Sequence, residues 1–311
     1  MCRHVWFPIE LAYVIIDEYQ SVGAIIGACK RVVFWSVMDM PAEFAKQFRV
    51  SGSKPFKLST IDSRNTCGFK DKEETKVRTA EDAVAIDALQ NTLFAEGKRS
   101  LLIVLQGIDC SGKDGTVRAV FNTCGPIGVQ IASFKAPSEE ELAHDYLWRV
   151  HQVTPRRGMI GIFNRSHYED VLVVKVKGYA TPETIERRYE EINQFEKTLA
   201  QNGTRILKFM LHISKEEQAE RLKDRVADPA KRWKFNPGDL EDRKLWDQYM
   251  AAYEVALQRC STDVAPWHVI PADRNWVRNG TISRIVRVTL EEMGPKYPEP
   301  KGWDPKSIVI Q

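Results

Sequence analysis

An apolar strand that runs directly into a glycine-rich loop is the feature that most constrains how this chain of 311 residues folds. Ser100–Gln106 is a continuous apolar run, which is typical of a strand covered on both faces. The loop Gly107-x4-Gly112-Lys113 follows it and leads into a helical pattern. A strand, a glycine loop and a helix in this order are the context of a phosphate-binding loop. The pattern therefore predicts a buried strand with phosphate bound at its carboxyl end.

Strands and helices alternate along the rest of the chain. This alternation predicts an α/β fold, in which a parallel sheet is covered by helices on both faces. Capping residues and glycines mark the ends of several helices, and Asp239 is the expected N-cap of one of them. The expected strands are 100–106, 130–134, 159–164, 205–213 and 267–271, and the expected helices are 72–96, 113–123, 139–151, 182–202, 215–227, 240–259 and 276–293.

The two ends of the chain differ from this regular middle. Residues 1–47 form an apolar extension of unknown role, which charged residues interrupt before it reaches the ~18 uncharged residues of a membrane span. It also lacks a cleavable signal sequence. An accessory apolar segment, a weak membrane-surface element and an N-terminus not required for folding all remain open. We expect a P-loop domain over 48–300, a tail over 301–311 and no membrane partner.

Composition argues against general nucleic-acid binding and against cysteine-based metal or redox sites. Forty-five Lys and Arg against 42 Asp and Glu give a net charge of +3, so no general affinity for nucleic acid is expected. The six cysteines form no C-x-x-C pair and have no zinc-finger spacing with histidine. Scattered thiols without a secretion signal fit a reducing compartment, and we expect a cytoplasmic protein.

The glycine loop carries the first candidate site residues. Its glycines let the backbone curl so that N–H groups and the helix N-terminus surround phosphate oxygens, and Lys113 adds a positive charge there. Asp114 stands where a Ser or Thr usually contributes a hydroxyl to Mg²⁺, so Asp109 is the expected oxygen ligand within the loop. The candidate phosphate-binding residues are Gly107, Ser111, Gly112, Lys113, Asp114, Gly115 and Thr116.

Two further groups of polar residues are candidates for the same site. Residues 163–170 follow the expected strand 159–164, at the end of the sheet where ligands gather in open α/β folds. The acidic residues of this group are candidate Mg²⁺ ligands, and Arg165 suits bidentate binding of phosphate. A basic segment between two helices suits closure over phosphates as a lid, and Lys135 is a separate basic candidate. The basic segment contains Arg221, Lys223, Arg225, Lys231, Arg232 and Lys234.

Four segments of the chain resemble the family-2 polyphosphate kinases. They are LQGIDCSGKDGT (105–116), SFKAPSEEELAHDYLWRVH (133–151), GIFNRSHYEDVLVV (161–174) and RWK (232–234). The arm that ends GFKDKEE and the tail KYPEP are similar to the class III branch of that family. The resemblance covers about 48–300 and implies that the protein moves phosphate from polyphosphate onto AMP and then ADP.

This resemblance also implies the fold and the roles of the residues. The fold would be like that of thymidylate kinase, a five-stranded parallel P-loop core with a helical lid at about 214–240. Asp109 and Asp170 would hold Mg²⁺, with Mn²⁺ as an alternative, and Glu140, among three competing glutamates, would face the acceptor nucleotide. The implied catalytic residues are Asp109, Lys113, Arg165, Asp170 and Arg225. The implied polyphosphate ligands of the lid are Arg221, Arg225, Lys231 and Arg232. The competing glutamates are Glu139, Glu140 and Glu141.

Other functions remain open beside this one. The first is a polyphosphate kinase specific for ADP, and the second is a nucleotide kinase on the same scaffold that uses ATP, against which Asp114 and the basic channel argue. The third is a P-loop switch or a polyanion-binding protein, although the N-K-x-D signature of guanine-binding proteins is absent from the sequence. The expected partners are inorganic polyphosphate and AMP, ADP or ATP, and we expect a homo-oligomer.

Overall fold

The expected strands form one parallel sheet in the computed structural model, which describes residues 42–52, 55–302, 304–308 and 310. The sheet order is β2-β3-β1-β4-β5, and all four pairings are parallel. The central strand is buried at every position, as its continuous apolar sequence predicts. The predicted five-stranded α/β fold is therefore confirmed. The strands are β1 (Ser100–Gln106), β2 (Val129–Ser133), β3 (Ile160–Asn164), β4 (Thr204–His212) and β5 (Trp267–Pro271).

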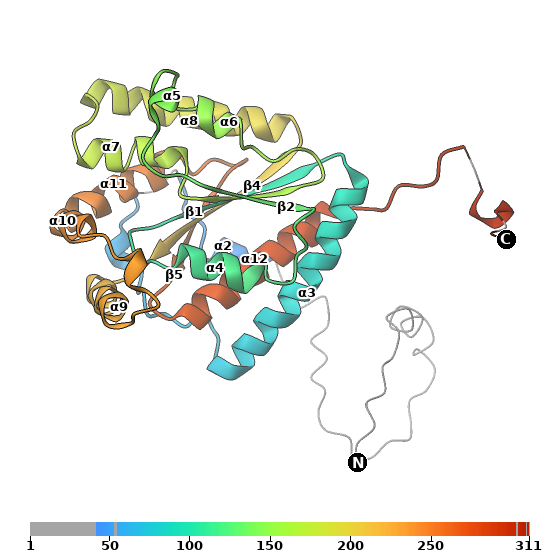
Figure 1. Cartoon of the computed structure of the whole chain (residues 1–311), viewed down its shortest axis with the longest axis horizontal. Helices are drawn as coiled ribbons and strands as arrows, with labels where there is room; N and C mark the ends of the chain where they lie inside the picture. The colour runs from blue at the N-terminus through green and yellow to red at the C-terminus, as the bar shows by residue number, and fades with distance from the viewer. Residues whose placement is uncertain (1–41, 53–54, 303, 309, 311) are drawn as a thin grey trace, which may run out of the picture. The chain divides into compact units, whose positions relative to one another are not determined.

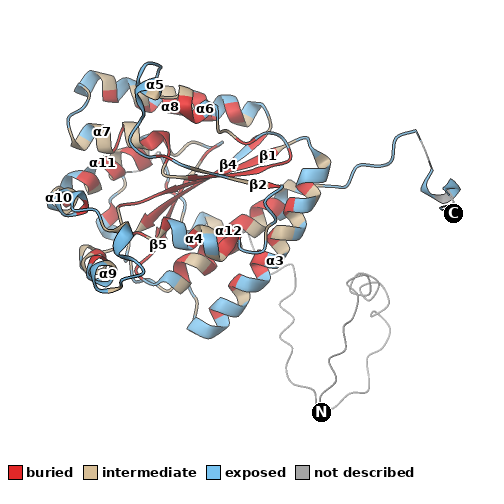
Figure 2. Cartoon of the chain, viewed as in Figure 1, coloured by how far each residue is buried: buried red, intermediate tan, exposed pale blue. Residues whose placement is uncertain are grey.

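Helices cover both faces of this sheet (Figure 1). Burial concentrates in the strands and in the helix surfaces that face them (Figure 2). Alternate residues of the strands feed two separate apolar clusters, one on each face. One face carries α3 (Lys72–Glu96), α4 (Lys113–Val120) and α12 (Asn275–Met293), and the other carries α7 (Val173–Val176), α8 (Pro182–Gln201) and α11 (Trp246–Arg259).

Two helices that the sequence pattern predicts as continuous are interrupted, so those predictions are wrong. Residues 139–151 form two short helices, α5 (Glu139–Leu142) and α6 (Trp148–His151). Between them the Asp145 carboxylate accepts a hydrogen bond from the backbone N–H of Leu147, a local bond that competes with the helix. The helix predicted over 240–259 begins earlier, as α10 (Gly238–Lys244), and breaks before α11. Pro237, rather than Asp239, is its N-cap.

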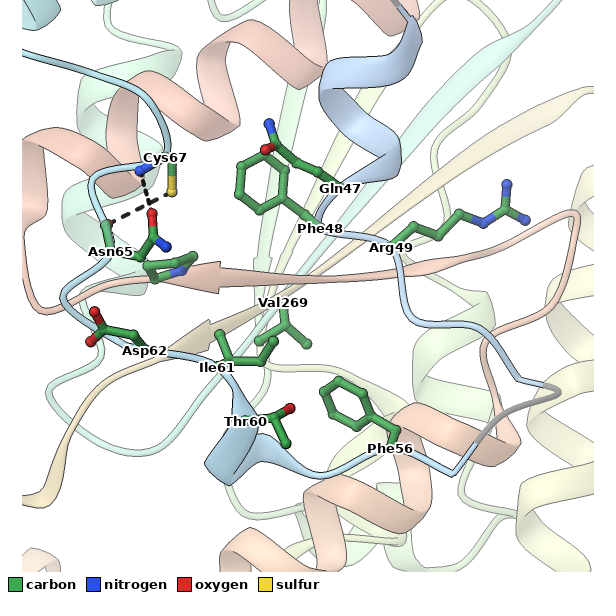
Figure 3. A pocket seen from close by; sticks show the side chains of 11 residues that line it. Gln47, Phe48, Arg49, Phe56, Thr60, Ile61, Asp62, Asn65, Cys67 and Val269 are labelled. Carbon is green, nitrogen blue, oxygen red and sulfur yellow. Dashed lines mark hydrogen bonds between the residues drawn. The ribbon is translucent and has the colours of Figure 1, made fainter.

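The segment before α3 covers the β5 edge of the sheet. After the short helix α2 (Ala42–Lys46), Val50 donates to the Trp267 carbonyl over 2.8 Å, and Val269 donates to the Phe48 carbonyl over 2.9 Å. The segment then passes through the turn η2 (Leu58–Thr60) and leaves a pocket of about 200 Å³ (Figure 3). Phe48, Phe56 and Val269 line this pocket, and none of its lining residues belongs to the P-loop.

Residues 1–41, most of the predicted N-terminal extension, lie outside the described residues. Among the residues that are described, no helix has both the length and the apolar character of a membrane span. At the other end, the segment after α12 is non-helical through Pro300, as its two prolines predict, and a single turn, η5 (Pro305–Ser307), lies beyond it.

Candidate active site

The P-loop connects β1 to α4 at the carboxyl end of the central strand. A Cβ on Gly107 would lie 2.7 Å from Ser111 Oγ, and a Cβ on Gly112 would lie 1.8 Å from Nη1 of Arg278. Both glycines have positive φ angles, 149° and 98°, which side chains disfavour. Gly112 is also the N-cap of α4. The glycine spacing therefore reflects a closely packed loop at a helix N-terminus, the local structure that binds phosphate.

The other P-loop candidates surround this turn. The Lys113 amine is buried and donates to the carbonyl oxygens of Gly107 (2.6 Å) and Ile108 (3.4 Å). Burial, with a smaller contribution from Arg165, lowers the pKa of Lys113. The Oγ of Ser111 is buried without a hydrogen-bond partner among the described residues. Thr116 is buried and Gly115 is exposed, both in the first turn of α4.

Asp109 lies at the centre of a cluster of charged groups. Its Oδ1 accepts a hydrogen bond of 2.5 Å from Nη2 of Arg165. Burial alone would raise the pKa of Asp109, but the charges of Lys113, Arg165 and Arg225 outweigh it and hold the pKa below its ordinary value. The structure therefore brings together four of the five predicted catalytic residues, with an ionised carboxylate among three cations.

The strand end that carries Arg165 is a strained turn. Arg165 has a φ of 63°, in the left-handed region, and its backbone N–H donates to the Leu105 carbonyl over 3.0 Å. Ser166 then caps the turn η3 (His167–Asp170) by accepting from the N–H of Tyr168. Gln106 at the end of β1 also donates to Ser166 Oγ over 3.1 Å. These bonds hold Arg165 against the P-loop.

The two adjacent carboxylates of η3 lie among different charged groups. Burial raises the pKa of Glu169, and the charges of Arg165 and Lys113 oppose that effect, so Glu169 belongs to the P-loop cluster. Asp170 instead pairs with Arg188, 3.3 Å away, and burial raises its pKa to about 6 against the charges of Arg188 and Arg149. Both carboxylates belong to the acidic residues that the sequence offered as Mg²⁺ ligands, and the resemblance singled out Asp170; in the structure Glu169 lies among the P-loop charges, whereas Asp170 lies beside Arg188.

Asp239 is a further carboxylate beside the P-loop that the sequence reasoning missed. It is buried in α10, 3.5 Å from Arg225. Burial, together with the nearby charge of Asp109, raises its pKa to about 6. Because this proximity arises only when α10 folds back over the P-loop, the sequence around Asp239 offered no signal beyond a helix start.

The basic residues of the lid do not all reach the P-loop. Arg221 on α9 (Lys215–Ala227) donates to the carbonyl oxygens of Cys110, Ala272 and Asp273, which ties the lid helix to the loop. Arg225 faces Asp109 and Asp239. The exposed residues Lys231 and Arg232 bond locally instead, to Asp228 and to carbonyl oxygens at the end of α9.

Lys234 reaches the P-loop although it was not among the expected phosphate ligands. It belongs to the turn η4 (Arg232–Lys234), and its Nζ donates to Asp114 Oδ2 over 2.9 Å. The other oxygen of Asp114 accepts from the Asn164 side chain over 2.7 Å. Burial opposes ionisation of Asp114, but these two hydrogen bonds outweigh it and lower its pKa. The residue that replaces the usual Ser or Thr therefore links the loop to the lid.

The candidates for the acceptor nucleotide lie in a second polar group. The buried Arg149 donates to the Lys135 carbonyl over 2.9 Å and lies 3.5 Å from Glu141. Lys135 and Glu141 line a pocket of about 310 Å³ beside β2. Glu139 and Glu140 are exposed on α5 and do not line this pocket. Through Arg149, this group is electrostatically linked to Asp170.

A magnesium ion would fit the P-loop cluster only together with its substrate. No three His, Cys, Asp or Glu side chains of the described residues are arranged to hold a metal by themselves. Mg²⁺, however, is commonly bound by one or two carboxylates plus water and substrate phosphates. The ionised Asp109 at the P-loop supplies such a carboxylate.

Comparisons with known proteins identify the family and the fold. A family model described as Polyphosphate kinase 2 matches residues 69–298. The chain is 49% identical to an AMP/ADP-polyphosphate phosphotransferase from Meiothermus ruber, over 85% of this chain and 99% of the relative. It is 38% identical to an ADP-polyphosphate phosphotransferase from Rhodopseudomonas palustris, over 82% and 92% of the two chains. The crystal structure of polyphosphate kinase 2 from Arthrobacter aurescens TC1 superposes with a TM-score of 0.81 at 41% identity, over 85% of this chain and 94% of that one.

Proposed function

Because this chain belongs to the polyphosphate kinase 2 family, we propose that it is a magnesium-dependent enzyme that moves phosphoryl groups between inorganic polyphosphate and adenine nucleotides. With polyphosphate as the donor, it converts AMP to ADP and ADP to ATP. The observation that carries the proposal is the grouping of Asp109, Lys113, Arg165 and Arg225 at a P-loop within that family's fold. The AMP and ADP specificity is supported by the name of the Meiothermus ruber relative.

The reaction needs positive charge around the transferred phosphoryl group more than it needs a base. A phosphate oxygen of AMP or ADP, already ionised at neutral pH, forms a bond to the terminal phosphorus of the polymer. The bond from that phosphorus to the bridging oxygen breaks, and the shortened polymer leaves as an anion. Lys113, Arg165 and Arg225 provide the charge that stabilises such a loose transition state.

We propose that Asp109 holds Mg²⁺ at the P-loop, with Mn²⁺ as a substitute. The second ligand in this proposal is Asp170, which pairs with Arg188 in the neighbouring group of charges in this structure. When bound, the metal would neutralise charge on the bridging and leaving oxygens. Glu169 and Asp239 are the other carboxylates that the fold brings to this cluster. Asp109 also accepts the hydrogen bond from Arg165, so it orients that side chain.

We propose that each of the two polar groups binds one substrate: the P-loop cluster binds polyphosphate, and the group around Arg149 binds the nucleotide. The P-loop residues and Arg225 would bind the terminal phosphates of the polymer, and the lid residues Lys231 and Arg232 would attract its further phosphates. The pocket beside β2 would take the acceptor nucleotide, with Glu141, the one of the three competing glutamates that lines it, facing the nucleotide in place of Glu140. We further propose a cytoplasmic homo-oligomer that does not bind nucleic acid; the free thiols of the described cysteines fit a reducing compartment.

The test uses purified protein, Mg²⁺ and long-chain polyphosphate, with AMP or ADP in separate tubes, and follows the nucleotides by chromatography. ADP and ATP formed from AMP would support the full proposal. ATP formed from ADP alone would favour an ADP-specific enzyme. No product in either tube, together with transfer from ATP to a nucleotide, would overturn the proposal in favour of an ATP-dependent kinase.

A further inference from the structure

A fully buried ionic network lies behind the η3 turn. Lys208 stands in the middle of β4, between Ile206 and Met210 on the same side of the strand, where the pattern calls for an apolar residue. Lys208 and Glu196 of α8 both have side chains with 0% exposure, and they form an ion pair of 2.6 Å. A charged pair so deep in an apolar cluster requires an explanation.

Every donor of the lysine is used. Its Nζ donates to Glu196, to the Tyr168 hydroxyl (2.7 Å) and to the Cys260 carbonyl (2.7 Å), which matches the three N–H groups of an ammonium. The Tyr168 hydroxyl in turn donates to Glu196 over 2.9 Å, and Nε2 of His167 lies 3.3 Å from the same carboxylate oxygen. The network therefore joins β4, α8, the end of α11 and η3.

Stability alone does not account for this arrangement. Desolvation of two charges offsets most of their attraction, and apolar side chains of similar volume often replace a buried ion pair without loss of stability. What the network does provide is a fixed position for η3, because two of the four residues in that turn, His167 and Tyr168, end in it.

The same turn carries the groups that face the P-loop. Arg165, just before it, holds a left-handed backbone conformation and bonds to Asp109, while Glu169 lies among the charges of Arg165 and Lys113. A strained conformation persists only where its surroundings over-determine it. The buried residues of the turn, His167 and Tyr168, thus fix the backbone that carries Arg165 and Glu169.

We propose that the Lys208–Glu196–Tyr168 network is a positioning device that holds Arg165 and Glu169 in place beside Asp109 and Lys113 for phosphoryl transfer. None of the three network residues touches the substrate in this proposal; they act through η3. The kinetic part of the inference rests on the proposed function, whereas the structural part does not.

The test compares two network variants with a matched control. Lys208→Met/Glu196→Gln replaces the ion pair by a neutral pair of similar size, and Tyr168→Phe removes one hydroxyl. For both we expect kcat to fall 10- to 100-fold while KM for ADP and for polyphosphate changes less than threefold, because geometry is lost and binding groups remain. The control, Asp82→Asn, breaks another ion-pair cluster, in which the buried Asp82 of α3 pairs with the partly buried Arg284 and Arg287 of α12. We expect it to lower the melting temperature and leave kcat within twofold of wild type.

A second readout does not depend on activity. Hydrogen exchange of a peptide that spans residues 162–172 reports the backbone bonds of Arg165 and Tyr168. We expect these amides to exchange at least tenfold faster in Tyr168→Phe than in wild type, and to be unchanged in Asp82→Asn. Wild-type kcat in a folded network variant, or unchanged exchange in Tyr168→Phe, would overturn the inference. If the wild-type protein lacks polyphosphate activity, the proposed function fails, and the exchange measurement still decides on the network.

Discussion

The carboxyl ends of β1 and β3, with Lys113 and Arg165, are called the sheet edge below. The sheet edge and the lid both supply cations to the P-loop, but they hold these cations in different ways. At the sheet edge Lys113 is buried, and Arg165 is fixed by backbone bonds to β1 and by the Asp109 carboxylate. In the lid, Lys231 and Arg232 are exposed and bond to groups of the lid itself. The edge is therefore organised before substrate arrives, whereas the outer lid has contacts that a polyanion can replace.

This difference separates the cations that stabilise the transition state from the cations that attract the polyanion. A cation held in a water-poor site without reorganisation stabilises developing charge strongly. An exposed cation is screened by solvent and salt, so it contributes more to encounter than to the chemical step. Arg225 stands between the two cases, because it belongs to the lid helix α9 yet faces Asp109 and Asp239.

The largest effects are expected at the sheet edge. Lys113→Ala and Asp109→Asn should each lower kcat by at least about 10³-fold, because each removes a charge at the transferred group. Circular dichroism and the melting temperature should show an intact fold. The exposed Lys76, which pairs with Glu73 on α3, is the control, and its replacement by Ala should leave kcat unchanged. Near-normal turnover in either site variant would refute the site assignment.

Within the lid, the comparison predicts two different kinetic effects. Arg225→Met should lower kcat about 100-fold, because its charge faces the reacting groups. Arg232→Ala should leave kcat within about twofold and raise KM for polyphosphate a few-fold, as expected for an exposed cation. Initial rates over a range of polyphosphate concentrations separate kcat from KM. Equal losses of kcat in both variants would show that the lid acts as one unit and would break the comparison.

The sheet edge was also the part that the sequence predicted best. The Gly107–Lys113 spacing, the buried strand before it and the polar residues after β3 lie close together along the chain, so local rules place them. Their assembly follows from parallel strands ending at one edge. The class of fold could be predicted for the same reason, since the alternation of strands and helices is read directly from the sequence.

The tertiary contacts that the lid and β4 make could not be predicted in this way. Asp239 approaches Asp109 only after α10 folds over the loop, and Asp114 meets Lys234 across a contact between distant segments. Lys208 breaks the apolar pattern of β4, but nothing local shows that its partners are Glu196 and Tyr168. Such contacts depend on tertiary packing that residue spacing does not encode.

Asp239 allows a test of the lid that uses stability and pH. Burial and Asp109 raise its pKa to about 6, above the ~3.9 of an unfolded aspartate, so the folded state binds more protons between these values. The contribution of Asp239 to the free energy of unfolding is therefore present at low pH and is lost as pH rises through 6. Asp239→Asn removes the ionised group and should raise the melting temperature by about 2 °C at pH 7.5, or ~1 kcal/mol after allowance for solvent screening.

The gain in melting temperature from Asp239→Asn should shrink as the pH is lowered to 5, where wild-type Asp239 is largely protonated. Thermal unfolding of both proteins at several pH values measures this gain. Asp263 is a fully exposed aspartate, and its Asn variant should show no such trend. A gain of the same size at every pH would mean that Asp239 ionisation does not oppose folding and that the lid carboxylate is not close to Asp109 in solution.

The smallest expected effect is at one of the contacts between the two regions, the ion pair of Asp114 with Lys234. The two side chains are 56% and 26% exposed, so their ion pair should contribute only ~0.5 kcal/mol. Chymotrypsin cleavage at Trp233 or Phe235 reports how often the lid leaves the loop. Asp114→Ala and Lys234→Ala should each raise the cleavage rate about twofold, and the double variant should raise it no further, because either change already removes the pair. Lys231→Ala, whose partner Asp228 lies within the lid, should not change the rate. Additive effects in the double variant would instead mean that Asp114 and Lys234 do not act as a pair in holding the lid.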